Sequence, residues 1–137
     1  MEEQWEPGMN AIQQSSEFAQ AGDTERAFNV LDAVLLRATE EKRTNWLTIL
    51  CEHAAILAHR IGDRGREIHY RAQALPYAKF YRFAACNLAM LLLDDGQTEL
   101  AKHYATEAYE QSVAAGTDDD IDLTAAILKL WPDLAQK

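Results

Sequence analysis

The side chains that could carry chemistry gather on one predicted helix, which holds Cys51, Glu52, His53 and His59. Glu52 and His59 share a helix face, and a carboxylate with an imidazole is a frequent general acid–base couple. Seven residues, however, span about 10.5 Å of an α-helix, too far for a hydrogen bond between the two groups. No two histidines lie one turn apart, which is the spacing that holds zinc on a helix. We therefore expect no catalytic pair, no metal site and no cofactor.

Positive charge gathers in one segment of an otherwise acidic chain. The formal net charge is −9, and residues 60–82 carry six basic and two acidic groups. The basic residues are Arg60, Arg64, Arg66, Arg71, Lys79 and Arg82. Aromatic residues interleave with the last two, as in some RNA-binding proteins, although aromatics filling a joint between helices would give the same pattern. Because the acidic flanks would repel a polyanion, we expect this patch to meet an acidic protein segment and not nucleic acid.

Composition points to one soluble domain. The chain has 137 residues, of which 48% are hydrophobic and 26% charged, values that are ordinary for a globular protein with a core. The two cysteines lie inside apolar patterns and fit a reducing compartment. The acidic start lacks the apolar run of a signal peptide, and no apolar run approaches 18 residues. A cytoplasmic protein without a membrane partner is expected.

Glycines punctuate the chain at nearly regular intervals. Gly22 and Gly62 are 40 residues apart, and Gly62 and Gly96 are 34 apart. Each can end one helix in a left-handed turn, and an amphipathic pattern follows each. A helix–turn–helix unit that repeats near this period is typical of stacked helical arrays.

The apolar spacing predicts seven helices and no strand. Asp23 is expected to cap the second helix and Thr44 or Asn45 the third, and Pro76 should end the fourth. The predicted ranges are about 8–21, 24–41, 45–61, 63–75, 77–93, 97–115 and 118–131. The fold class is therefore all-α.

These repeats resemble the tetratricopeptide (TPR) family, whose 34-residue helix pairs keep small residues at fixed positions. The matching residues are Leu88, Ala89, Leu92, Gly96, Ala101 and Ala108 in the third copy; Ala54, Ala55, Ala58, Gly62, Ile68, Tyr70 and Ala74 in the second; and Ala11, Ser15, Phe18, Gly22, Ala27 and Leu31 in the first. The second copy departs from the pattern at Glu67, where the family prefers alanine. The resemblance implies a right-handed solenoid of three antiparallel helix pairs over 8–115, with a leader at 1–7 and a capping helix and tail at 116–137.

In this family the first helix of each pair lines a concave groove. The resemblance places there Ile12, Ser16, Ile49, Glu52, Ile56, His59, Phe83 and Met90. Such an apolar groove would receive an amphipathic helix or an extended peptide; alternatively, Ile49 and Met90 are simply core. One subgroup grips a terminal carboxylate with Lys, Asn and Arg, but Ile12 and Ser16 occupy the corresponding places in the first copy, so that activity is not expected.

The sequence thus predicts a non-enzymatic protein–protein interaction module or scaffold that binds another protein or a peptide. The alternative is a regulatory or sensor protein that binds a small ligand or nucleic acid through residues 60–82. A homodimer is expected if Trp131 and its neighbours Leu128 and Leu130, or Trp5 and Trp46 at the other end, remain uncovered.

Overall fold

The computed structural model describes residues 4–136, which contain seven α-helices, two short 3₁₀ segments and no strand. The α-helices are α1 (Glu6–Gln20), α2 (Thr24–Glu40), α3 (Thr44–Arg60), α4 (Arg64–Ala74), α5 (Tyr81–Asp94), α6 (Thr98–Ala115) and α7 (Asp118–Leu130). The 3₁₀ segments are Leu75–Tyr77 and Pro132–Gln136. The all-α prediction is confirmed. The chain divides into two compact units, Met1–Tyr77 and Ala78–Lys137, which are described separately.

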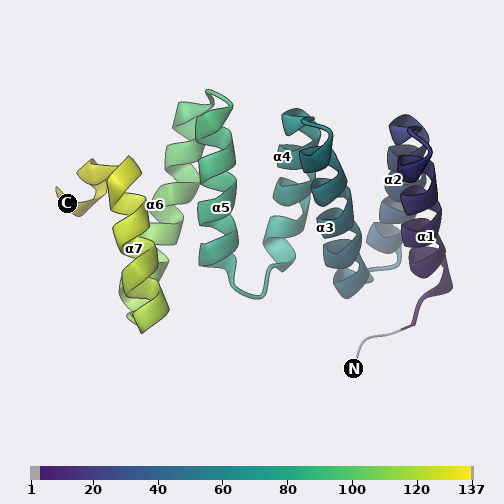
Figure 1. The fold of residues 1–137 in the computed structure, drawn as a ribbon. Coiled ribbons are helices and arrows are strands. Elements are labelled where there is room, and N and C mark those ends of the chain that lie inside the picture. The colour runs from purple at the N-terminus through teal and green to yellow at the C-terminus, as the bar shows by residue number, and fades with distance from the viewer. Residues whose placement is uncertain (1–3, 137) are drawn as a thin grey trace. The chain divides into compact units, whose positions relative to one another are not determined.

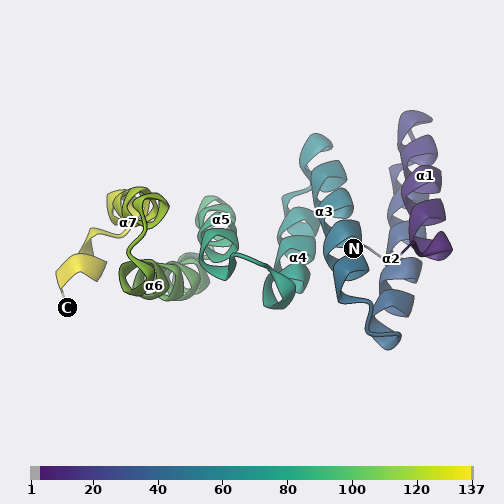
Figure 2. The ribbon, with the colours of Figure 1, turned by 90° about the horizontal axis from the view of Figure 1, so that it is seen from below.

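The first unit is built around α3. Figure 1 shows α1 paired with α2 and α3 paired with α4, and α3 also contacts both α1 and α2. Figure 2 shows the same two pairs from below. Phe28, Leu31 and Leu50 are fully buried between them, and Phe28 stacks on Tyr70 with ring centroids 6.0 Å apart.

In the second unit α6 packs against both α5 and α7. Its core holds Leu88 and Leu92 from α5 and Ile127 from α7, all essentially without exposed surface. The 3₁₀ segment Pro132–Gln136 follows α7 and packs on it, with Leu134 buried.

Helices within each unit approach closely where the sequence places alanine. Ala55, Ala89, Ala101 and Ala108 have no exposed surface, as expected from the repeat pattern. A single methyl group lets two helix axes approach, and larger neighbours fill the space on either side.

Three interhelical turns of the repeats end their helices with a left-handed glycine, at Gly22, Gly62 and Gly96. Asp23 and Asp63 then cap the next helices by accepting hydrogen bonds from the backbone N–H of Arg26 and Arg66. The turn between α2 and α3 makes the same pair of closing hydrogen bonds, but its left-handed residue is Lys42, with φ of 57°. The cap predicted at Thr44 or Asn45 is wrong, since Arg43 is the N-cap and no side chain caps this helix.

Replacing Lys42 by glycine should stabilise the protein by about 0.5–1 kcal/mol. The left-handed backbone costs a side-chain-bearing residue about 1–2 kcal/mol, and the flexibility of glycine in the unfolded chain offsets part of that gain. Gly62→Ala is the reverse control: an added Cβ would meet nothing within 4 Å, so its cost of about 1–2 kcal/mol comes from the backbone alone. Urea unfolding measures both, and a Lys42→Gly variant less stable than the parent would contradict this account.

Two helix starts differ from the sequence expectation. α1 begins at Glu6 because Pro7 lies in its first turn, where a proline's missing N–H is not needed. α5 begins at Tyr81 and not at Tyr77, because the chain leaves α4 through the 3₁₀ turn Leu75–Tyr77 and passes Ala78–Phe80 before becoming helical again.

The tryptophans near the two ends are buried. Trp5 and Trp46, in the first unit, retain 6% and 8% of their surface, and their rings lie 6.0 Å apart. The guanidinium of Arg43 lies 4.9 Å from the centre of the Trp5 ring, and Trp131 in the second unit is also buried. The three tryptophans are thus covered, whereas Leu130 beside Trp131 keeps 45% of its surface, and the homodimer stays a prediction.

Gly8 lies beneath Trp46, and the two helical glycines of this unit should respond to alanine with opposite signs. A Cβ on Gly8 would lie 2.5–2.9 Å from Trp46 ring atoms, whereas a Cβ on Gly65 would meet only Asp63 Oδ1 at 3.7 Å. Gly65→Ala should gain up to about 1 kcal/mol from helix propensity. Gly8→Ala should lose about 1–2 kcal/mol net, because overpacking outweighs that gain. Chemical unfolding decides, and equal stabilisation by both variants would show that Trp46 does not restrict Gly8.

No α-helix in residues 4–136 combines the length and apolar character needed to cross a membrane.

Candidate binding site

A pocket of about 420 Å³ opens where α1 faces α3 in the first unit. Its lining residues are Ser15, Ser16, Ala19, Gln20, Thr24, His53, Ile56, Leu57, Arg60 and Ile61. Short side chains on α1 leave this space, because Ser15, Ser16 and Ala19 all face the longer side chains of α3. The pocket thus combines apolar side chains with several hydrogen-bonding groups.

The serine hydroxyls of α1 are already engaged by their own helix. Ser15 Oγ and Ser16 Oγ both donate to the carbonyl oxygen of Ile12, at 3.0 and 2.8 Å. Ser16 Oγ also lies 3.5 Å from Nε2 of His53 on α3. Each hydroxyl can still accept a hydrogen bond.

Arg60 supplies the fixed charge of the pocket. Burial, and after it the charge of Arg60, lowers the pKa of His53 below its usual value, so His53 is neutral at pH 7. No carboxylate lines the pocket. Arg60 is exposed and makes no ion pair with any residue of the described chain.

Of the predicted groove residues in this unit, Ser16 and Ile56 line the pocket. Ile12 and Ile49 are half-buried and pack against the core of the unit. The structure therefore gives Ile49 the packing role that the sequence left as the alternative.

The remaining predicted groove residues have other neighbours. Glu52 is exposed, with Oε2 3.5 Å from Arg71 Nη1. His59 Nδ1 lies 3.2 Å from Oε1 of the buried Glu67. Phe83 and Met90 lie on α5 in the second unit, both half-buried.

The residues of α3 that were predicted to line the groove are shifted by one position from those that line the pocket. The predicted stripe was 49, 52, 56 and 59, whereas the residues of α3 that line the pocket are His53, Ile56, Leu57 and Arg60. One residue rotates a helix face by about 100°, so a shift of one position exchanges much of a face. Gln20, Thr24 and Ile61 were missed because nothing in their spacing separates them from ordinary helix ends.

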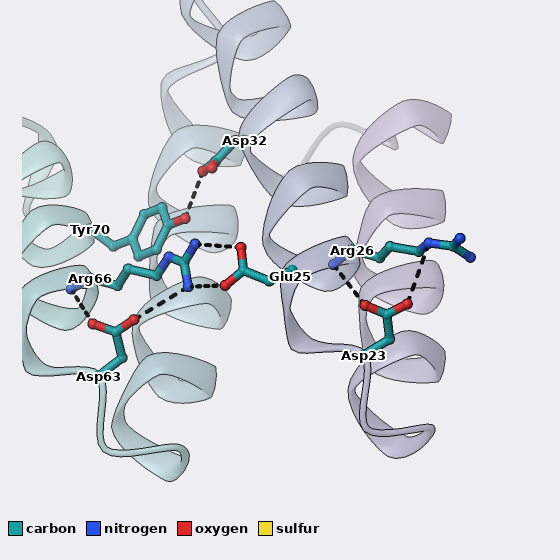
Figure 3. A network of polar contacts seen from close by, with 7 residues as sticks. All are labelled: Asp23, Glu25, Arg26, Asp32, Asp63, Arg66 and Tyr70. Carbon is teal, nitrogen blue, oxygen red and sulfur yellow. Dashed lines mark hydrogen bonds and ion pairs between the residues drawn. The ribbon is translucent and has the colours of Figure 1, made fainter.

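Three of the six basic residues of the patch, Arg66, Arg71 and Arg82, contact carboxylates of the protein. Figure 3 shows Arg66 reaching from α4 to Glu25 on α2, where two nitrogens each bond one carboxylate oxygen at 3.0 Å. Arg66 also donates to Asp63 Oδ2 at 3.3 Å and lies 4.2 Å from the centre of the Phe28 ring. Its charge is thus shared between two carboxylates and an aromatic face.

A second contact between the same helices lies beside that ion pair. The hydroxyl of Tyr70 on α4 donates to Asp32 Oδ1 on α2 at 2.6 Å (Figure 3). Burial, then this hydrogen bond, raises the pKa of Tyr70 well above its usual value. Tyr70 therefore serves as a fixed hydrogen-bond donor that ties α4 to α2.

Arg82, in the second unit, donates from Nε and Nη2 to the two carboxylate oxygens of Asp120. The Asp120 carboxylate is buried and also accepts from the Thr117 hydroxyl at 2.6 Å and from the Thr117 backbone N–H at 3.2 Å. The second of these bonds, together with the one that the Asp120 backbone N–H donates to Thr117 Oγ1, forms a capping box at the start of α7. Lys79 lies 5.6 Å from the centre of the Phe80 ring. Arg64 is exposed on α4. Arg60 is the basic residue that lines the α1–α3 pocket.

Arg82, followed by Thr117, lowers the pKa of Asp120 from 3.8 to about 2. Its ionised form therefore adds stability above pH 3.8, and that contribution is lost as the pH falls toward 2. We expect Asp120→Asn to be less stable than the parent at pH 7 and the gap to shrink between pH 4 and pH 2. Urea unfolding followed by circular dichroism across this range measures the gap, with the exposed neighbour Asp119→Asn as control. A gap that does not change with pH would contradict the assignment.

Neither cysteine is placed for nucleophilic chemistry. Cys51 and Cys86 are buried and unpaired. Burial raises the pKa of the Cys51 thiol to about 12 and also raises that of Cys86. Within the described residues, no group of three or more His, Cys, Asp or Glu side chains is placed to hold a metal ion.

Neither a scan against protein-family models nor searches of curated proteins and solved structures find a significant match to this chain. The pocket and its residues must therefore be interpreted from their own chemistry.

Proposed function

We propose that this protein is a protein–protein interaction module whose α1–α3 pocket binds a segment of a partner protein. The observation that carries the proposal is a concave opening with apolar side chains at its mouth. Ile56 and Ile61 retain 38% and 44% of their surface there, beside the polar groups of Gln20 and Arg60. Exposed apolar surface next to a few hydrogen-bonding groups is what a peptide-binding site offers.

We infer further that α1–α6 are three TPR-like helix pairs and that α7 is a cap. The left-handed glycines that end α1, α3 and α5 and the fully buried alanines support this interpretation. In such repeats the first helix of each pair faces the ligand, and the pocket lies between two of those helices, α1 and α3.

Binding of nucleic acid or a small ligand through residues 60–82 has less support. Arg66, Arg71 and Arg82 each contact a carboxylate of the protein. A phosphate would have to displace those partners, and the net charge of −9 opposes the approach of a polyanion. The unpaired, buried cysteines fit the cytoplasmic location expected from the sequence.

Ile56→Glu should abolish partner capture without unfolding the protein, because it places a charge at the mouth of the pocket. The matched control is Leu36→Glu on α2, which makes the same change at a side chain with 62% of its surface exposed and outside the pocket. Pull-down from cell extract, compared by mass spectrometry, measures partner recovery, and thermal melts verify folding. Identical partners captured by both folded variants would show that the α1–α3 pocket is not the binding surface.

A further inference from the structure

The charge of the pocket is opposite to that of the chain that builds it. The protein has 22 acidic and 13 basic residues, yet no carboxylate of residues 4–136 lines the pocket. The only ionisable groups there are Arg60 and the neutral His53. From α1 and α2 the facing residues are all uncharged, namely Ser15, Ser16, Ala19, Gln20 and Thr24. An anion entering the pocket would thus meet a cation and no competing carboxylate.

Arg60 differs from the arginines that contact carboxylates within the fold. Arg66 and Arg71 hold Glu25 and Glu52 in the same unit, whereas Arg60 makes no ion pair within the described residues. A guanidinium offers a planar set of N–H donors that match the two oxygens of a carboxylate. The N–H donors of the Arg60 guanidinium therefore remain available to a ligand.

The apolar residues next to Arg60 set what must accompany the anion. Ile56 lies one helical turn before Arg60, and Ile61 directly follows Arg60 in the chain. Both side chains line the pocket and keep exposed surface. A ligand that covers them removes apolar area from water at about 25 cal/mol per Å². A ligand that fits the pocket therefore carries an apolar side chain next to the carboxylate that pairs with Arg60.

Building on the function proposed above, we infer that the partner is an acidic peptide segment. An internal Asp or Glu of that segment pairs with Arg60, and a neighbouring aliphatic side chain covers Ile56 and Ile61. A single carboxylate needs only one cation, whereas nucleic acid would bring a row of phosphates against a chain of net charge −9.

Peptide selection with the whole chain tests this inference. A library of random segments of roughly ten residues, about 33 Å when extended, is displayed between fixed flanks so that no segment carries a free terminus. The immobilised protein selects from it, and the selected peptides are resynthesised with both ends capped. Their dissociation constants are then measured by fluorescence anisotropy. We expect Asp or Glu to be enriched at one position next to a Leu, Ile or Val.

Charge reversal at Arg60 provides the specific arm of the test. Arg60→Glu should weaken the selected peptides about tenfold or more and should itself select Lys or Arg at the acidic position. The control is Lys129→Glu, the same charge change at an exposed residue of α7 in the other unit. It should alter binding by no more than about twofold, because Lys129 is not among the residues that line the pocket.

The outcomes separate this inference from the function on which it rests. Selected peptides that lose binding in Ile56→Glu but show no acidic position, or that bind Arg60→Glu unchanged, would overturn the acidic partner and leave the binding module standing. Peptides unaffected by Ile56→Glu, or a library from which nothing is captured, would overturn both. Loss of binding when the selected acidic residue is replaced by its amide, together with the Arg60→Glu result, supports the pairing.

Discussion

The first unit depends on how closely α3 can approach its neighbours. Ala54, Ala55 and Ala58 on this helix have no exposed surface, and they allow α1, α2 and α4 to pack around it. Longer side chains at these positions would separate the helices and open the core. Where α3 borders the pocket it carries longer side chains, namely His53, Ile56, Leu57 and Arg60. The pocket is the space that those residues share with the short side chains of α1.

Electrostatic contacts set the arrangement of α4 relative to α2. Arg66 and Tyr70 leave α4 one turn apart and reach Glu25 and Asp32 on α2. Exposed ion pairs contribute little to stability one at a time, but this one is bidentate and lies over the Phe28 ring. It positions α4 more than it stabilises the fold, and it removes one arginine from those available to a ligand.

Local signals in the sequence predicted most of the fold. Glycines at 22, 62 and 96 marked turns because only glycine adopts the left-handed backbone without cost, and the alanine spacing marked the helix contacts. The turn at Lys42 makes the same closing hydrogen bonds, but it carried no such signal because a lysine occupies the left-handed position. The start of α5 was missed because aromatic residues from 77 to 83 fit a helix or a joint equally well.

The site was harder to predict than the fold because it depends on rotation of helices about their axes. Periodicity shows that α3 has an apolar face, but the packing of α1 and α2 decides which neighbouring stripe borders the pocket. Arg60 was identified as basic from the sequence. That it borders a pocket, while Arg66, Arg71 and Arg82 bind carboxylates of the protein, follows only from contacts between residues far apart in the chain.

The two cysteines lie one in each unit, Cys51 on α3 and Cys86 on α5, and both are buried and unpaired. A thiol that is inaccessible in the native state reacts with an alkylating reagent only when its surroundings open. The unmodified chain therefore contains an internal reporter of local opening for each unit. Single-cysteine labelling rates distinguish units that open independently from units that open in one cooperative step.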